Sequence, residues 1–258
     1  MTNMGLRFTV KGADFSEKAV NYVPPVGEGL EYLNFFGGAD KLGRNLAPGK
    51  PSGQVVGSPA FTANSMTPLQ MLNYIQTGVP HTDEMTFMVV AKGPTDDVNS
   101  HLISNFWSSR VGGVGNTVGA SVMTMPVAPS GDGIGREALA WSAWDGVSST
   151  SLQITTNMPP HPVAEMKAIA ATISKANRVG EIFNKTAGLS VKGAPLPDGT
   201  TTDLGGEFRI GSAYLSVSGA QPSEILFVAI WSRVLNEAEI EVMYQAVKGY
   251  YAIRGVSL

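Results

Sequence analysis

One segment alone has the pattern of an amphipathic helix, and the remainder of the chain must be explained around it. Residues 236–251 open on Asn236, which can cap a helix, and Glu239 stands three residues later, as a capping box requires. Apolar residues then recur at helical spacing, which predicts a helix over 237–251 with one buried stripe. The stripe comprises Ile240, Met243, Tyr244, Val247 and Tyr251.

The rest of the chain is a series of short segments with the pattern of β-strands. Residues 225–231 are almost unbroken in apolar side chains and short enough for a buried strand. Residues 84–91 are apolar on both faces, as in a strand that is covered on two sides. Residues 162–177 could form a helix, but alternating β-branched residues favour a strand over 166–174. Further strands are predicted at 6–10, 101–107, 138–144, 181–185 and 207–214.

Glycine-rich loops separate these segments, at residues 110–120, 128–137 and 193–207. Thirty glycines and sixteen prolines raise the density of turns, and 43% hydrophobic residues suffice for a sizeable core. Many short strands, turns rich in glycine and proline, and one helix predict an all-β sandwich that the helix braces from one side.

Charge and cysteine content exclude several classes of protein. The net charge is −3 and no basic run occurs, which argues against a nucleic acid as partner. The absence of cysteine excludes disulfides and thiolate chemistry. No stretch approaches about 18 apolar residues, and the first residues lack the pattern of a signal peptide. We therefore expect neither a membrane span nor a secretion signal.

The last fifty residues carry an ordered set of motifs. An "IG" pair at Ile210 precedes an irregular stretch and the strand 225–231, and an "R-x-L" corner starting at Arg233 leads to "E-I-x-x-x-Y" from Glu239. This order resembles the end of concanavalin A-like (laminin G-like) jelly-roll domains. The resemblance extends over residues 54–258. It implies a concanavalin A-like β-sandwich with one short C-terminal helix and a short, irregular N-terminal extension.

The N-terminal stretch, residues 1–53, carries a second resemblance. "KGADFSEKAVNYVPPVGEGLEYLNFFGG" and "RNLAPGKPSGQVVGSPAF" are similar to virion proteins encoded in tailed-phage structural operons, where a short start segment precedes a laminin G-like sandwich. The resemblance implies a virion protein assembled in the host cytoplasm, in which residues 1–53 dock and contribute an edge strand.

The function that these resemblances imply is structural, at the tail tip, baseplate or fibre. The partners would be other virion proteins, further copies of the chain and a host-surface glycan. Three alternatives stay open: a capsid decoration protein, a carbohydrate-binding lectin that acts alone, and a glycan-degrading enzyme.

Glycoside hydrolases of this fold class carry paired carboxylates on one strand, at a separation suited to retaining chemistry. The laminarinase-type pattern E-x-D-x-E is absent here, and Glu84 and Glu181 stand alone in their segments. From this absence we predict a protein that is not an enzyme and needs no cofactor.

Loop carboxylates could bind Ca²⁺ as in legume-type lectins. The candidates are Asp96, Asp97, Asp198 and Asp203. Aspartate is also a common turn residue, and no dense set of ligands is visible, so the turn interpretation is favoured. The three histidines, His81, His101 and His161, share no metal-binding spacing.

Tryptophans offer a possible contact with sugar rings. Trp141 and Trp144 differ by an odd number, so on a regular strand they point to opposite faces. One is then expected in the core, and the other could stack on a sugar or lie in a subunit contact. Trp144 and its neighbour Asp145 are the candidates for glycan contact, whereas Trp107 and Trp231 are expected in the core.

Aromatic residues also crowd a segment near the N-terminus that proline and glycine interrupt. Such a segment is expected to be too interrupted to hold a regular element, and its composition predicts a docking surface, or else a cover for the end of its own sandwich. The candidate interface residues are Tyr22, Leu30, Tyr32, Phe35 and Phe36.

Overall fold

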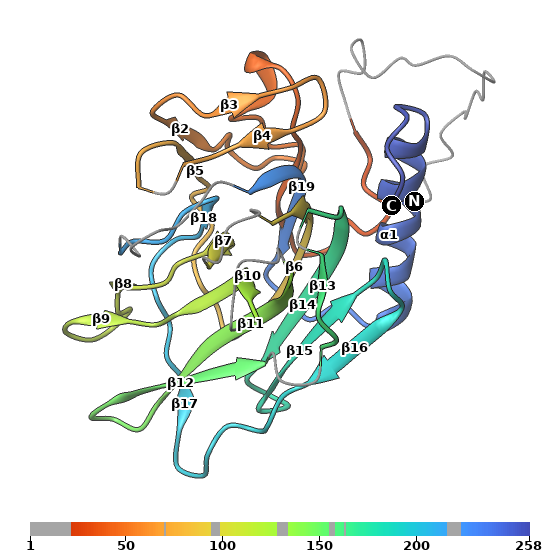
Figure 1. Cartoon of the computed structure of the whole chain (residues 1–258). Helices are drawn as coiled ribbons and strands as arrows, with labels where there is room; N and C mark the ends of the chain where they lie inside the picture. The colour runs from red at the N-terminus through yellow and green to blue at the C-terminus, as the bar shows by residue number, and fades with distance from the viewer. Residues whose placement is uncertain are drawn as a thin grey trace, which may run out of the picture.

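The computed structural model describes residues 22–69, 71–93, 99–127, 134–154, 158–162, 164–215 and 223–258, with 151–154 described by their backbone. Over these residues two antiparallel sheets pack face to face, and one α-helix lies outside them (Figure 1). The predicted all-β sandwich with a C-terminal helix is therefore confirmed. The strand predicted at 6–10 and the candidates Asp96 and Asp97 lie outside the described residues.

The first sheet, here called sheet A, includes the strand just before the helix and the strand of the N-terminal segment. Its order is β16 (Leu189–Lys192), β15 (Val179–Asn184), β14 (Lys167–Ser174), β6 (Glu84–Lys92), β19 (Glu224–Trp231), β4 (Met66–Thr67) and β3 (Ala60–Phe61), and β1 (Leu30–Phe35) also pairs with β19. Residues 167–174 form β14, so the choice of strand over helix in this segment is confirmed.

The second sheet, here sheet B, faces sheet A across the core. Its order is β12 (Ser149–Ile154), β11 (Ile134–Trp144), β10 (Ala120–Pro126), β7 (Ser100–Ser104), β18 (Arg209–Ile210), β5 (Tyr74–Gln76) and β2 (Gln54–Val56), with β13 (His161–Pro162) and β17 (Thr201–Thr202) paired to β11. A separate two-stranded hairpin joins β8 (Ser108–Ser109) to β9 (Asn116–Thr117), and a 3-10 turn, η1, covers Ala39–Lys41.

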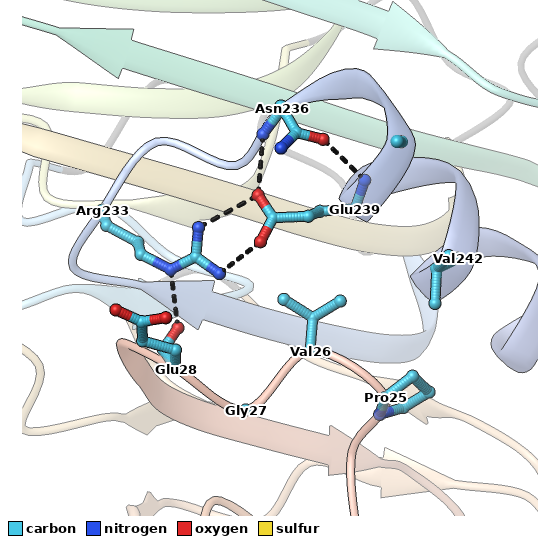
Figure 2. A pocket seen from close by; sticks show the side chains of 9 residues that line it. Pro25, Val26, Gly27, Glu28, Arg233, Asn236, Glu239 and Val242 are labelled. Carbon is cyan, nitrogen blue, oxygen red and sulfur yellow. Dashed lines mark hydrogen bonds and ion pairs between the residues drawn. The ribbon is translucent and has the colours of Figure 1, made fainter.

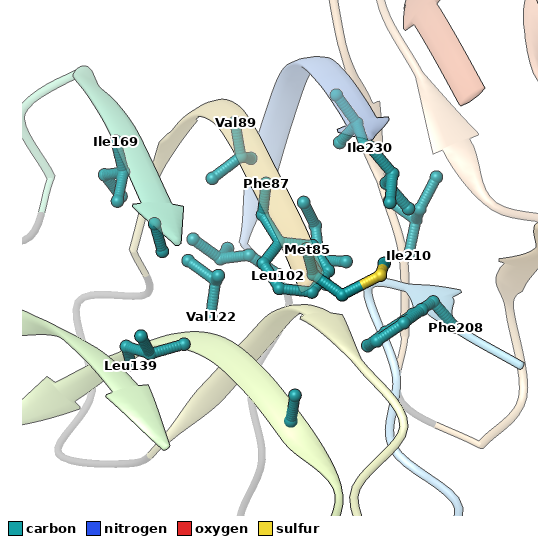
Figure 3. Packing of buried hydrophobic residues seen from close by; sticks show 14 of the residues in the cluster. Met85, Phe87, Val89, Leu102, Val122, Leu139, Ile169, Phe208, Ile210 and Ile230 are labelled. Atoms are coloured by element: carbon teal, nitrogen blue, oxygen red, sulfur yellow. The ribbon is translucent and has the colours of Figure 1, made fainter. Parts of the chain in front are cut away.

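The main core fills the space between the sheets. Alternate residues of β6, namely Met85, Phe87 and Val89, meet Leu102 and Val122 of sheet B (Figure 3). This is the inward face of a strand with a two-residue repeat. Side chains on the other face of β6 are buried as well, as the apolar run of this strand predicts.

The helix α1 (Glu237–Ala252) covers the outer face of sheet A. Asn236 accepts a hydrogen bond from the Glu239 backbone and Glu239 returns one, so the capping box is confirmed. The buried residues of α1 are the predicted stripe: Ile240, Met243, Tyr244, Val247 and Tyr251. Within the described residues no helix is both long enough and apolar enough to cross a membrane.

The N-terminal segment is more regular than its composition predicts. Residues 30–35 form β1, which pairs with β19 from Leu30↔Trp231 to Phe35↔Phe227. Prolines and two glycines precede this run and two glycines follow it, but LEYLNF itself contains neither residue type, so the run is free to extend along β19. The expectation that this segment holds no regular element was wrong.

Candidate functional site

A groove of about 520 Å³ opens where the hairpin of β8 and β9 meets the ends of both sheets. The loop after β8 forms one wall, and β17 with the end of β11 forms the floor. We call it the Arg110 groove. Its lining residues are Asp83, Arg110, Val111, Gly112, Gly113, Trp144, Gly146, Lys175, Thr201, Thr202, Asp203 and Leu204.

A buried ion pair joins the wall of the groove to its floor. Arg110 donates from Nε to Oδ1 of Asp203 at 2.8 Å and from Nη2 to Oδ2 at 3.1 Å, a bidentate arrangement. Asp203 is held in place because β17 pairs with the end of β11 and the Asp203 amide donates to the Ser142 carbonyl. The side chains of Arg110 and Asp203 are 11% and 1% exposed, respectively. Burial would raise the pKa of Asp203, but hydrogen bonds, first among them that of Arg110, outweigh it and keep this pKa below its ordinary value.

The guanidinium of Arg110 also lies over the indole of Trp144, 3.7 Å from the ring centroid. Trp144 is half-buried, whereas Trp141, three residues earlier, is fully buried between the sheets. The predicted division of these two tryptophans between opposite faces is therefore what the structure has. Nearby, the Thr202 hydroxyl is buried and makes no hydrogen bond within the described residues. Thr202 stands opposite the core residue Ala143, so this hydroxyl points to the inner face, and what the groove offers is an aromatic ring beside a planar cation.

Asp145, the other candidate for glycan contact, is exposed and closes a turn. Its Oδ1 accepts from the amides of Val147 and Ser148, and its Oδ2 accepts from the Ser148 hydroxyl. Hydrogen bonds from Ser148 and Val147 lower the pKa of Asp145. The carboxylate thus closes the turn between β11 and β12, beside Trp144 but outside the residues that line the groove.

A buried histidine supports the groove from behind. Nδ1 of His81 accepts hydrogen bonds from the Gly205 amide at 3.1 Å and from Asn105 Nδ2 at 3.2 Å. Burial lowers the pKa of His81 to about 4, so the ring is neutral near pH 7. His81 therefore fixes the segment that follows Asp203, a role that the sequence does not reveal.

The far wall carries a second ion pair, in which Lys175 Nζ lies 2.8 Å from Asp83 Oδ2. Asp83 stands just before β6 and Lys175 just after β14, so this wall comes from sheet A. The charged residues of the lining are two cations and two anions, so the groove carries no net charge.

The predicted Ca²⁺ candidates do not form a metal site in the described part of the chain. Asp203 is occupied by Arg110, and the Asp198 side chain is fully exposed, 3.8 Å from Arg178. Over the described residues no three His, Cys, Asp or Glu side chains gather as metal ligands would.

The predicted interface residues lie against the chain's own sheets and helix. Tyr32 is 0% and Phe36 is 2% exposed, and Leu30 and Phe35 are similarly buried. Tyr22 is partly buried and packs edge-on against Phe35. This arrangement corresponds to the alternative in which the segment covers its own core. The burial of these residues within one chain does not test assembly, so a contact with other proteins stays a prediction.

The remaining tryptophans divide differently from the prediction. Trp231 is fully buried, as expected, and its indole donates to the Val26 carbonyl. Trp107 was expected in the core, but it is 43% exposed. Strand β7 ends at Ser104, and Trp107 follows in a turn with φ of 64°, so its side chain leaves the sheet.

A second hollow, at the start of α1, uses its charges internally (Figure 2). Arg233 pairs with both carboxylate oxygens of Glu239, at 2.6 and 3.0 Å, and donates to the Glu28 carbonyl. Glu239 in turn accepts from the Asn236 amide. These bonds tie the chain before β1 to the helix start, which is a structural task, so the Arg110 groove is the better candidate for a ligand.

One buried carboxylate escaped the sequence analysis. Glu137 lies on β11, two residues before Leu139 and on the same inward face, and its Oε1 is 2.5 Å from His161 Nε2. Asn184 of sheet A donates to its other oxygen at 3.3 Å. Burial lowers the pKa of His161, but Glu137 outweighs this and the pKa is raised. The alternation E-x-L-x-W-x-A in β11 was a usable signal for this inward carboxylate.

No protein-family model and no curated protein matches this chain. Solved structures do match. The chain is similar to Trypanosoma rangeli sialidase in complex with sialic acid, with a TM-score of 0.57 and 12% identity over 85% of this chain and 33% of the sialidase chain.

It is also similar to the receptor binding domain of botulinum neurotoxin C/D mosaic serotype, with a TM-score of 0.57 and 8% identity over 86% of this chain and 52% of that one. A third match is a structure of botulinum neurotoxin type C, whose cell entry depends upon interaction with two ganglioside molecules. Its TM-score is 0.58, with 6% identity over 86% of this chain and 52% of that one. The chain thus spans about a third of the sialidases and about half of the toxin chains. At these identities the likeness shows a shared jelly-roll β-sandwich fold.

The comparison corrects one prediction. The missing pair of carboxylates led to the expectation that the protein is not an enzyme, and this is contradicted by sialidases and a variant with trans-sialidase activity among the matching structures. The physical reason is that the laminarinase pattern tests for one arrangement of catalytic groups only. A sandwich of this shape also occurs as part of chains that are enzymes, so the absence of that pattern excludes little.

Proposed function

We propose that this chain is a carbohydrate-binding β-sandwich and that the Arg110 groove is its binding site. The observation that carries the proposal is the half-buried Trp144 with Arg110 stacked on it in the lining of the groove. Sugar rings have apolar C–H faces that lie on indole rings, and hydroxyl edges that bond to polar groups. The matching structures include a sialidase in complex with sialic acid and a toxin whose cell entry depends on gangliosides. These ligands support a sugar as the class of ligand, but sialic acid is an anion and does not support a neutral one.

The charges of the groove favour a neutral, polyhydroxylated ligand over an anionic one. Arg110 is neutralised by Asp203 and Lys175 by Asp83, so neither cation needs an anion from the ligand. A phosphate would compete with two carboxylates for the same cations. Hydroxyl groups can instead accept from a guanidinium N–H and donate to a carboxylate oxygen at once, without displacing either ion pair.

A glycan array with the wild-type protein, followed by calorimetry on the best ligand, tests the proposal. Trp144→Ala should weaken binding by about tenfold or more, the usual effect of removing an aromatic anchor. Trp107→Ala is the matched control, because this tryptophan is also exposed and lies outside the groove. Wild-type protein that binds no glycan, or a Trp144→Ala variant that binds normally, contradicts the proposal.

We further propose that this binding serves a tailed-phage particle, at its tail tip, baseplate or fibre, with a capsid decoration protein as the alternative. The support is the resemblance of the N-terminal stretch to virion proteins in which a short start segment precedes a laminin G-like sandwich, together with the resemblance of residues 54–258 to such a sandwich. Quantitative mass spectrometry of purified particles tests it: tail proteins are present in a handful of copies and decoration proteins in hundreds. Absence from particles would leave a lectin that acts alone.

A further inference from the structure

The end of the sandwich built by β2, β3, β4 and β5 exposes apolar side chains. These strands lie together beyond the central strands of both sheets (Figure 1). We call residues 54–76 the β2–β5 end. Val55 is 39%, Phe61 47% and Leu72 63% exposed. Leu69 and Met71, in the turn between β4 and β5, are also exposed.

Two of these side chains belong to the inward faces of the sheets. Val55 stands opposite Ile75, which is fully buried in the core, and Phe61 stands opposite Met66, which is buried there too. Directly opposed residues of an antiparallel pair point to the same face. Because β2 and β3 are the last strands of their sheets, the core between the sheets reaches the surface here.

The β2–β5 end lies in the middle of a long stretch without charge. Residues 51–82 contain no Asp, Glu, Lys or Arg, although charged residues make up 15% of the chain. Edge strands of soluble monomers are usually protected by charged side chains, especially lysine. Charged residues are depleted at the centres of protein interfaces. The structure brings a charge to this end from Arg209, whose guanidinium lies over Tyr74 and beside Met71. An apolar edge whose own residues carry no charge has the composition of a contact surface.

The surface is held in a fixed shape. Gly57, with φ of 67°, ends β2, and a Cβ there would lie 2.1 Å from the Leu72 carbonyl oxygen, so only glycine allows β2 this close to the turn. Met71, also at positive φ, donates from its amide to Ser212 Oγ. Leu72 is thereby presented outward by a braced turn.

We propose that the β2–β5 end is a self-association surface, and that its partner is a second copy of this chain. In a two-fold contact each residue near the axis faces the same residue of the other copy, so a charged residue there would meet a like charge. The residues of the β2–β5 end carry no charge, so their contact with a second copy is free of this repulsion. Contact between two copies would cover Val55 and Phe61 of both chains and close both cores. Self-association was expected at the N-terminal aromatic residues, which the structure buries, and the inference moves it to the neighbouring β2–β5 end, since β1 and β4 both pair with β19.

Sedimentation velocity from about 1 to about 100 µM tests the proposal, because a complex with a Kd of about 10 µM changes from mostly dissociated to mostly associated in this range. We expect wild-type protein to sediment as a reversible dimer. Phe61→Lys should weaken association by at least about tenfold, since each dimer gains two like charges at the contact. Thermal melting of the same variant establishes that it is folded, and Leu72→Lys, on the more exposed turn, repeats the test if it is not.

Leu189→Lys is the matched control. Leu189 is 40% exposed on β16, the edge strand at the other side of sheet A, so the change adds the same charge to the other edge. Its dimer should be unchanged. Wild-type protein that stays monomeric throughout, or a dimer that Leu189→Lys dissociates and folded Phe61→Lys does not, overturns the proposal.

Discussion

Acidification should destabilise this protein well before its carboxylates are protonated, because two histidines are buried in neutral form. Burial lowers the pKa of both His81 and His101 from 6.5 to about 4. Near His81 the charges of Asp203 and Asp83 oppose the shift, and burial still dominates. Between pH 6.5 and about 4 the unfolded chain therefore binds protons that the folded chain refuses, so the free energy of unfolding falls with pH in this window.

The size of the effect follows from these pKa values. At pH 5 each buried histidine lowers the free energy of unfolding by about 2 kcal/mol relative to pH 7.5, and the two together lower it by about 4 kcal/mol. This is a large part of the total stability of an ordinary domain. His161 acts in the opposite direction, because Glu137 raises its pKa and its ion pair is gained as the pH falls through that value. A His161→Gln variant should therefore lose more stability between pH 7.5 and pH 5 than wild type does.

Urea unfolding at pH 7.5 and pH 5, followed by tryptophan fluorescence, measures the difference. His101→Gln should reduce the loss by about 2 kcal/mol, whatever it does to the stability at pH 7.5. A wild-type difference below about 1 kcal/mol would refute the reasoning, as would a His101→Gln variant with the wild-type difference. Either result would mean that water reaches the imidazoles in the folded protein.

Three further outcomes are expected. Phe35→Ala and Phe36→Ala should each lower the free energy of unfolding by about 3 to 5 kcal/mol, because both rings are buried in the chain's own core. Assembly of the folded fraction should stay normal. Unchanged stability with lost assembly would instead support the docking surface. Asn236→Ala should cost about 1 kcal/mol in the same assay through the lost helix cap, and no change would mean that the cap is dispensable. Arg110→Met should cost about 3 to 5 kcal/mol because it leaves the Asp203 carboxylate buried and unpaired, and adding Asp203→Leu should recover much of that loss. If the double variant is no more stable than Arg110→Met alone, the pair is not coupled as described.

Local signals made much of the fold predictable. The helix could be predicted because Asn236 and Glu239 stand three residues apart and because apolar residues recur at helical spacing. All of these signals lie within the helix and its cap. The strand β6 follows from its apolar run. By contrast an edge strand was expected within residues 1–53 but the position of β1 was missed, because prolines and glycines flank it and its partner β19 is distant in the sequence. Local pattern cannot reveal a pairing of that kind.

The candidate site divides in the same way. Trp144 could be singled out from its odd spacing to Trp141, which is a property of one strand. Arg110 and Asp203 could not be paired, because 93 residues separate them and each lies in a segment with the composition of a turn. The missed His81 meets Gly205 across 124 residues. Sites built from such distant loops emerge only when the sheets bring them together.

The pairing of β1 with β19 has a consequence for how the protein is made. Leu30 and Trp231 lie opposite each other, so about 200 residues must leave the ribosome before the first strand meets its partner. Until then the apolar side of β1 has neither β19 nor the helix to cover it. Closing a loop of that length is slow, which makes folding late and leaves the nascent chain open to aggregation. We expect the folded protein to appear only after translation passes the helix, and its yield to depend on chaperones that hold the early strands.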